Sequence, residues 1–279
     1  MLGKLIKHEW KSVSRVGCLL LGAMALITFF GWLGFQTPMW NALDNGGSQF
    51  GWLDVFGIMT LMLYVVMLVA VNYGILAYLG VHFYKTMYAD EGYLTHTLPV
   101  TKHQILLSKI LVSSLWMMIL ILSVYLSLVI LGLAMLTAVM PKGYPEISLW
   151  RDVIPGMRDI LYWAGLELGW DVGSWVISVF VTSMVSPFAT VTILFGAISI
   201  GQLFTKFRIL MAIVTYVGIL VAQSVIGALL RSILAVNGSS LFGTYMNVSL
   251  NSNILINCLA AVALYFVAWY ITGNKLNME

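Results

Sequence analysis

Six apolar stretches, each about as long as a lipid bilayer is thick, divide this 279-residue chain. An α-helix rises about 1.5 Å per residue and the hydrocarbon core is roughly 30 Å thick, so about 20 apolar residues cross it once. Only 9% of the residues are charged, whereas soluble domains average about 25%. We therefore expect an all-α polytopic membrane protein whose single transmembrane domain fills residues 1–279. The six predicted spans are Val16–Gln36, Val55–Val81, Ile110–Val139, Ser174–Gln202, Ile209–Leu230 and Asn253–Gly273.

The charged residues between these spans are sorted by side. An even number of crossings places both termini on one side, and ten of the 14 Lys and Arg residues fall there with four of the 11 acidic residues. Because an excess of Lys and Arg marks the cytoplasmic side, we predict a multi-pass protein of the cell membrane with both termini in the cytoplasm. No face carries a basic stripe interleaved with stacking aromatics, which argues against a nucleic-acid partner. The four histidines, His8, His82, His96 and His103, lie on the cytoplasmic side too.

Residues 1–15 form a segment with its own pattern. Apolar residues recur near helical spacing and lysines fill the positions between them. Such a helix is expected to lie in the cytoplasmic headgroup layer, in contact with membrane lipids, as an amphipathic elbow before the first span. A plain basic anchor is the alternative. The central residues of the predicted elbow are Lys7, His8, Glu9 and Trp10.

The longest cytoplasmic loop, residues 82–109, holds the densest polar sequence. Thr101 and Gln104 fit a capping box, and Pro99 prevents one continuous helix through this loop. We therefore expect the third span to begin as a helix while still in the cytoplasm. Before Pro99, Ala89–Thr97 is long enough for a short helix, whose Tyr93 and Leu94 have no evident membrane to enter.

On the outer side, residues 140–173 make the largest segment. Arg158–Trp170 mixes Trp, Tyr and Leu with Asp159 and Glu167, which predicts a short amphipathic helix at the outer interface. In the fourth span Pro187 predicts a kink, because proline removes a backbone hydrogen bond. The Ser and Thr residues around it either line a pathway or pack against neighbouring helices.

The residues that several kinds of chemistry require are absent from the expected positions in the sequence. No ionisable side chain lies in the middle of a span, the nearest being Asp54 and Arg231, which argues against an ion-coupled carrier. Zinc-protease, nucleophile-elbow and phosphate-loop motifs are absent from the sequence. We therefore predict no enzyme activity, no catalytic residue, no metal site and no cofactor in this chain, and the sequence identifies no substrate-binding residue.

Residues Asp90–Lys109 read DEGYLTHTLPVTKHQILLSK. This stretch resembles the first cytoplasmic loop of ABC-2-type transporter permeases of Gram-positive bacteria. Members often carry a related E-G-Y-L-x-x-x-L-P-V-[ST] stretch, followed by a helix that opens in a Ser-Lys pair. The layout is similar too, with an elbow, six spans and a coupling loop between the second and third spans. One departure is that many members have a re-entrant outer element between spans five and six, where this chain has the short polar segment Val236–Ser252.

The resemblance implies a permease that dimerises with a second copy or a sister permease. It also implies two copies of a separate ATP-binding subunit, which would hold the ATP and Mg²⁺. In the family, the short helix of the loop seats in a cleft of the ATPase and transmits its closure, with the elbow packed beside it. Here Tyr93 and Leu94 would dock; the alternative is that they fold back onto the membrane surface. The implied interface comprises Asp90, Glu91, Gly92, Tyr93, Leu94, Thr95, His96, Leu98 and Pro99.

The function that follows from the resemblance is the membrane-spanning subunit of an ATP-driven exporter. Apolar walls without buried charge suit an amphipathic cargo such as a peptide, drug or lipid. A second hypothesis is a membrane anchor or sensor that recruits a cytoplasmic partner without transport, and a third is a membrane enzyme with sparse polar residues.

Overall fold

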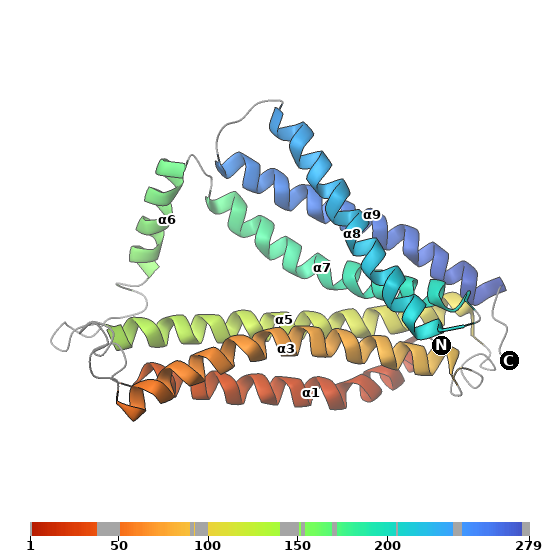
Figure 1. The fold of residues 1–279 in the computed structure, drawn as a ribbon, viewed down its shortest axis with the longest axis horizontal. Coiled ribbons are helices and arrows are strands. Elements are labelled where there is room, and N and C mark those ends of the chain that lie inside the picture. Colours follow the sequence, from red (N-terminus) through yellow and green to blue (C-terminus); the bar gives the residue numbers. More distant parts are fainter. Residues whose placement is uncertain are drawn as a thin grey trace. The chain divides into compact units, whose positions relative to one another are not determined.

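The computed structural model shows an all-α protein and describes residues 2–37, 51–89, 92, 100–139, 151, 154–168, 172–204, 206–236 and 242–274. Six of the helices in this part of the chain are long and apolar enough to cross a membrane. They coincide with the six predicted spans, so the prediction of a multi-pass all-α membrane protein is confirmed by helix length and hydropathy. The helices, in chain order, are α1 (Leu2–Phe35), α3 (Trp52–Tyr88), α5 (Lys102–Val139), α6 (Ile154–Leu168), α7 (Val172–Gly201), α8 (Arg208–Val236) and α9 (Phe242–Asn274) (Figure 1).

The chain divides into two compact units. Unit 1 comprises Met1–Glu9, Leu79–Leu115 and Ile147–Glu279, and unit 2 comprises Trp10–Tyr78 and Trp116–Glu146. Helices α1, α3 and α5 each pass from one unit into the other, whereas α6 to α9 belong to unit 1.

Unit 2 is a bundle of three long helical segments from α1, α3 and α5, which lie side by side (Figure 1). Small residues let the helices approach closely, as is usual where lipid replaces water as the solvent. A Cβ atom at Gly17 would overlap the ring of Trp116, and one at Gly34 would overlap the hydroxyl of Thr60. Within the described part of unit 2, the hydroxyls of Tyr64 in α3 and Ser127 in α5 form a hydrogen bond of 2.8 Å.

In unit 1, α7 is the central helix. Gly196 packs against Leu264 of α9 so closely that a Cβ atom would not fit, and Gly201 packs equally closely against the backbone of Ala212 in α8. The rings of Phe83 from α3 and Phe195 from α7 stack 3.9 Å apart. The core of unit 1 therefore forms where the last turns of α3 and α7 meet α9.

Helix α8 has much less protein around it than α7. Only 6% of the residues in its most apolar window are buried, against 33% in α7. Its contacts include one near each end: Ala212 meets Gly201, and Arg231 Nη1 donates to Asn253 Oδ1 of α9 at 3.2 Å. Between these contacts, α8 exposes a long series of large apolar side chains.

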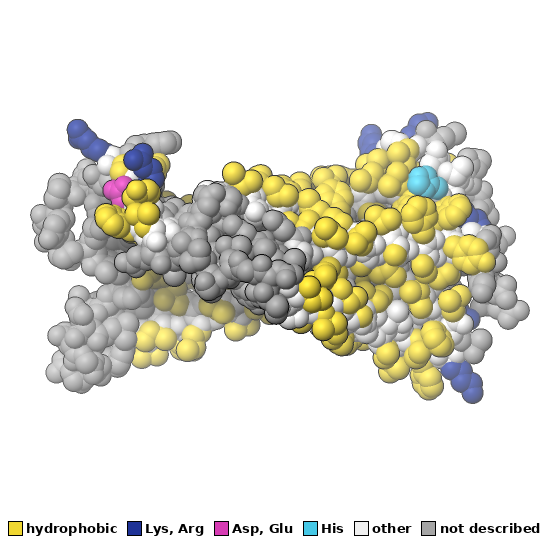
Figure 2. All heavy atoms as spheres, turned by 90° about the horizontal axis from the view of Figure 1, so that it is seen from above, with side chains coloured by type: hydrophobic (Ala, Val, Ile, Leu, Met, Phe, Trp, Pro, Cys, Tyr) yellow, Lys and Arg dark blue, Asp and Glu magenta, His cyan; other side chains and the backbone are white. Residues whose placement is uncertain are grey.

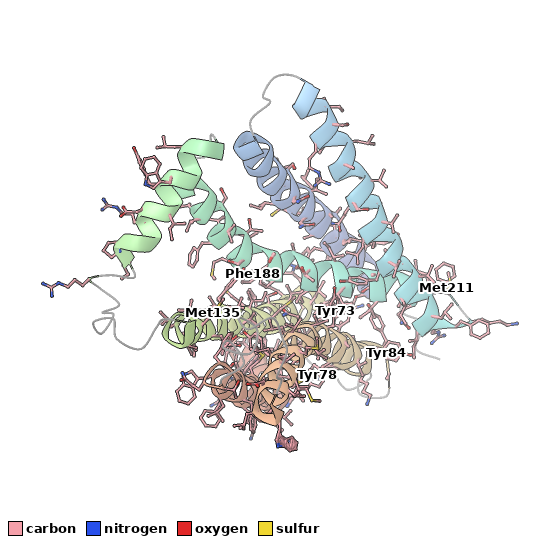
Figure 3. The ribbon with its side chains drawn as sticks, turned by 60° about the vertical axis from the view of Figure 1, so that its left-hand side comes forward. Tyr73, Tyr78, Tyr84, Met135, Phe188 and Met211 are labelled. Atoms are coloured by element: carbon pink, nitrogen blue, oxygen red, sulfur yellow. The ribbon has the colours of Figure 1, made fainter. Side chains whose placement is uncertain are left out.

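Pro187 lies inside α7, which runs unbroken from Val172 to Gly201. Figure 3 labels the next residue, Phe188, where α7 changes direction, in agreement with the predicted kink. The hydroxyls of Ser183, Thr192 and Ser199 donate to carbonyl oxygens of α7 itself, three or four residues earlier. These hydroxyl donors are therefore satisfied within their own helix.

The surface that faces the viewer in Figure 2 is mostly hydrophobic where it is described, with Lys and Arg only toward helix ends. Large apolar side chains of α8 and α9, such as Leu220 and Phe266, are more than 40% exposed. Soluble proteins rarely expose such continuous apolar surface. This surface agrees with a protein whose solvent is lipid.

Two further predictions concern the segments in which α1 and α6 begin. The segment predicted as an elbow does not form a separate helix, because α1 continues unbroken from Leu2 to Phe35. No proline interrupts the chain between the polar and apolar parts of α1, so the backbone hydrogen bonds of the helix continue from one part into the other. The outer segment does contain a short helix, α6, which begins at Ile154, four residues before the predicted start.

Candidate functional site

Most of the predicted loop interface lies outside the described residues, namely Asp90, Glu91, Tyr93, Leu94, Thr95, His96, Leu98 and Pro99. Gly92 is described and buried, and its N–H donates to Ala89 O at 2.7 Å. A Cβ atom at Gly92 would overlap the backbone carbonyl of Met87. The chain therefore turns tightly after α3, and glycine is the residue that this close approach allows.

The return of the chain into α5 follows the predicted capping pattern. Helix α5 begins at Lys102, eight residues before the predicted start of the third span at Ile110. The N–H of Gln104 lies 3.4 Å from Thr101 Oγ1, and the N–H groups of Gln104 and Ile105 donate to Thr101 O. Thr101 therefore caps α5. The helix begins before the residue at which the third span is predicted to start, as expected.

Both ends of the loop are tied to other helices of unit 1. At the end of α3, the Tyr88 hydroxyl donates to Ser199 Oγ of α7 at 2.7 Å and lies 3.4 Å from Thr272 Oγ1 of α9. At the start of α5, Lys102 Nζ donates to Gly273 O of α9 at 3.0 Å. Next to it, His103 Nδ1 lies 2.6 Å from the Tyr265 hydroxyl of α9. We name these six residues the loop anchors: Tyr88, Lys102, His103, Ser199, Tyr265 and Thr272.

The loop anchors differ in exposure. Ser199 and Thr272 are almost fully buried, whereas Lys102 and His103 are exposed. Ser199 Oγ donates to Phe195 O and Thr272 Oγ1 donates to Ala268 O, so both hydroxyls present acceptor positions to Tyr88. The single hydroxyl proton of Tyr88 goes to Ser199, so this tyrosine joins the last turns of α3 and α7 and lies beside Thr272 of α9.

A second group of polar side chains lies further from the loop, on α3 and α5, together with Glu9 of α1. Lys109 Nζ donates to Glu9 Oε1 at 2.5 Å and to Thr86 Oγ1 at 2.8 Å. His82 Nε2 lies 3.2 Å from Glu9 Oε2. The Lys109 side chain is only 3% exposed, and those of Glu9 and His82 are 14% and 15% exposed. We name Glu9, His82, Thr86 and Lys109 the charged cluster.

The charged cluster joins three helices of unit 1, with Glu9 from α1, His82 and Thr86 from α3, and Lys109 from α5. Of the four residues predicted at the centre of an elbow, only Glu9 belongs to it. Lys7 and His8 are exposed on α1, and the Trp10 side chain is 37% exposed. In unit 2 the ring of Trp10 lies 5.1 Å from that of Trp116.

The two ionisable residues nearest to the middle of a predicted span have structural partners. The Gly51 N–H donates to Asp54 Oδ2 at 2.8 Å, so Asp54 caps the start of α3. Arg231 bonds Asn253, as described above. Within the described ranges, no group of three or more His, Cys, Asp and Glu side chains is placed to hold a metal ion.

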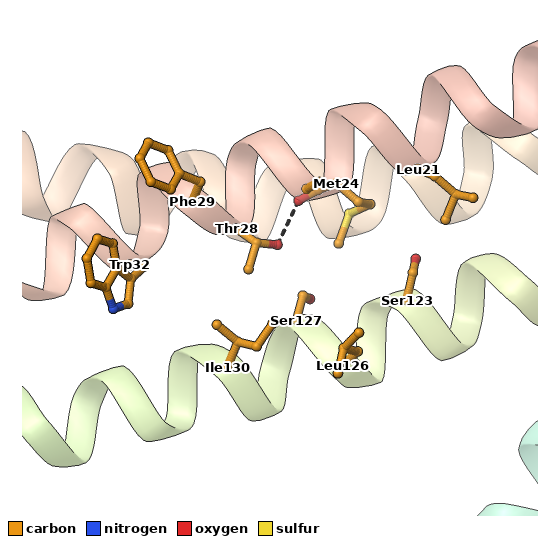
Figure 4. A pocket seen from close by; sticks show the side chains of 10 residues that line it. Leu21, Met24, Thr28, Phe29, Trp32, Ser123, Leu126, Ser127 and Ile130 are labelled. Atoms are coloured by element: carbon orange, nitrogen blue, oxygen red, sulfur yellow. Dashed lines mark hydrogen bonds between the residues drawn. The ribbon is translucent and has the colours of Figure 1, made fainter.

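Unit 2 contains an apolar pocket of about 440 Å³ between α1 and α5 (Figure 4). No lining residue is charged, and its three hydroxyls belong to Thr28, Ser123 and Ser127. Each of them donates to a carbonyl of its own helix, as Figure 4 shows for Thr28 and Met24 O. The lining is Leu21, Met24, Ala25, Thr28, Phe29, Trp32, Ser123, Leu126, Ser127 and Ile130.

Comparison with protein families, with curated proteins and with solved structures finds no match for this chain. Arguments about its function therefore depend on its own residues and geometry.

Sequence reasoning missed most of the charged cluster and the buried loop anchors. It places His82 and Lys109 only at the bounds of the cytoplasmic loop, and it makes no prediction for Thr86 and Tyr88. One signal was present: Lys109 lies three and four residues after Leu106 and Ile105, on a helical face that is otherwise apolar. A charge on such a face predicts a buried ion pair, because an unpaired buried charge is strongly unfavourable.

Proposed function

We propose that this protein is the membrane-spanning permease subunit of an ATP-driven exporter, coupled through the loop after α3 to a separate ATP-binding subunit. The observation that carries the proposal is the anchoring of this loop at both ends. Tyr88 before it donates to Ser199 of α7, and Lys102 after it donates to Gly273 O of α9. A partner that moves the loop would therefore also move the ends of α7 and α9.

Two other features support the proposal. The loop sequence resembles that of ABC-2-type permeases, with Gly92 at a position where only glycine fits. Coupling to an ATPase also requires the loop to be linked to membrane helices, and the loop anchors provide this link through polar bonds. A ligand can shift a conformational equilibrium only by differential contacts in the two states, and the anchored loop offers such contacts.

For the cargo, we propose a molecule with an uncharged apolar body, such as a lipid, a drug or an apolar peptide. The pocket in unit 2 supports this class, since its size lies in the range of small-molecule sites and its lining is free of charge. The dimer with a second or sister permease, the cytoplasmic termini and the bacterial cell membrane belong to the same proposal. The charge distribution of the sequence supports the orientation.

The experiment is affinity purification of the tagged protein from its native membrane, followed by identification of co-purifying chains and their ATPase rate. The variant Tyr93→Ala/Leu94→Ala removes the two apolar side chains of the loop. The matched control is Leu203→Ala/Phe204→Ala, which removes two exposed apolar side chains from the connection between α7 and α8. An ATP-binding subunit that the wild type and the control retain and the loop variant loses supports the proposal.

The opposite result is the absence of an ATP-binding subunit. If no ATP-binding chain co-purifies with the wild type, the exporter proposal fails. The anchor or sensor hypothesis then predicts a different cytoplasmic chain that depends on the same loop residues.

A further inference from the structure

We infer that the charged cluster is a latch, which holds residues 2–9 of α1 against α3 and α5 and opens as a local unit. Glu9 is the only residue of this segment in the cluster, and its two carboxylate oxygens face partners on two different helices. The inference rests on the proposed function for its role, because the latch lies at the base of the coupling loop.

Position is the first argument. His82 and Thr86 lie within the last two turns of α3, and Lys109 lies two turns after the Thr101 cap of α5. Thr86 is two residues from the loop anchor Tyr88. The charged cluster is therefore the first polar contact that a movement of either loop end would reach beyond the loop anchors.

Burial is the second argument. Lys109 is 3% exposed and stands among buried apolar residues of its own helix, Ile105, Leu106, Ile110 and Val112. Apolar side chains of similar volume are often as stabilising as a buried ion pair at such a place, or more so. Stability alone therefore does not require charges here, whereas a contact that must open and re-form does benefit from them.

The third argument is that several polar side chains on this segment of α1 are exposed. Lys4, Lys7 and His8 are exposed on the same segment of α1 and have no polar partner among the described contacts. Glu9 is the one acidic residue of residues 2–9. Among the described contacts, Glu9 therefore makes the polar attachment of this segment to the rest of unit 1, and we expect loss of its bonds to loosen the segment.

Amide hydrogen exchange of the full-length permease in lipid nanodiscs tests the latch, because exchange measures local opening segment by segment. Three forms are compared: the wild type, the apolar pair Glu9→Leu/Lys109→Met and the charge-swapped pair Glu9→Lys/Lys109→Glu. We expect residues 2–9 to exchange about tenfold more slowly in the apolar pair than in the wild type, and the charge-swapped pair to restore faster exchange. Helices α7 to α9 serve as the internal reference, with unchanged exchange in all three forms.

Equal exchange of residues 2–9 in the wild type and the apolar pair would overturn the inference, because a purely structural ion pair would not open locally. The thermal midpoint confirms that the apolar pair is folded. Should the charge-swapped pair fail to fold, Lys109→Arg replaces it, since arginine keeps the charge and is expected to exchange like the wild type.

A second measurement separates this inference from the proposed function. With the ATP-binding subunit bound, a non-hydrolysable ATP analogue is expected to speed exchange of residues 2–9 in the wild type and to leave the apolar pair unchanged. A bound subunit and analogue without any change in the wild type would contradict the latch. If no ATP-binding subunit exists, the proposed function fails, while exchange in the permease alone still decides whether the latch opens.

Discussion

Units 1 and 2 both bring helices close together at glycines, and they differ in the polar contacts that accompany this packing. In the described part of unit 1, charged and hydroxyl side chains join helix ends around the loop after α3. In unit 2, the helices approach through Gly17 and Gly34, and the interhelical hydrogen bond of Tyr64 is buried beside apolar residues. Close packing favours one fixed arrangement, whereas polar contacts can exchange partners. Under the proposed function, this difference leads us to expect the conformational change in unit 1.

The largest expected effect comes from the charged cluster. Lys109→Met leaves the Glu9 carboxylate buried with less compensation, so we expect a loss of about 3 kcal/mol in the free energy of unfolding. Reversible unfolding in mixed detergent micelles measures it. Lys85→Met, an exposed lysine on α3, is the control and should change stability by less than about 0.5 kcal/mol. Equal effects of the two substitutions would show that burial of Lys109 is unimportant.

Next in size is a substitution in the close-packed unit. Gly17→Ala places a methyl group against the rigid ring of Trp116, and we expect a loss of about 2 kcal/mol. Gly22→Ala is the matched control on the same helix, because nothing lies within 4 Å of its added Cβ atom. The control should be neutral or slightly stabilising, since alanine favours helix more than glycine. The same unfolding assay compares them, and a neutral Gly17→Ala would contradict close packing in unit 2.

A smaller effect is expected at the loop itself. Thr101→Ala removes the cap of α5 and should cost about 1 kcal/mol, while Thr101→Ser keeps the hydroxyl and should cost less. Hydrogen exchange of the first turn of α5 reports the local effect. If alanine and serine behave alike, the hydroxyl is not the group that caps the helix.

The smallest effects are expected for two interhelical hydroxyl bonds, one in each unit. Tyr88→Phe removes the bond to Ser199, and Tyr64→Phe removes the bond to Ser127. Each should cost about 0.6 kcal/mol, the average for such bonds between membrane helices. Only Tyr88→Phe should also alter the ATPase rate of the complex. An altered rate in both variants would show that the two units do not divide their roles in this way.

The sequence predicted the helices better than their ends. Length and hydropathy identify six spans because lipid leaves no alternative to a helix for backbone hydrogen bonding. Length and hydropathy do not identify where a helix ends, because polar residues that follow an apolar stretch can remain helical. Helix α3 thus extends beyond Val81 to Tyr88, and α5 begins eight residues before Ile110.

Contacts between helices were much less predictable. Glu9 and Lys109 are 100 residues apart in the chain, and hydropathy does not tell which helical faces meet. The Thr101 cap was predicted because its partners are local, within four residues of sequence. The separate elbow was not found, because amphipathic spacing describes the faces of a helix and not the angle at which it meets the next segment.

The sparse packing of α8 has a consequence for the membrane in which the protein works. Protein contacts hold this helix near Ala212 and Arg231, and many of the large apolar side chains between them are exposed. A helix in that situation responds to mismatch with the hydrocarbon thickness by changing its tilt. Bilayer thickness, set by lipid chain length, therefore acts on α8 before it acts on the better covered α7.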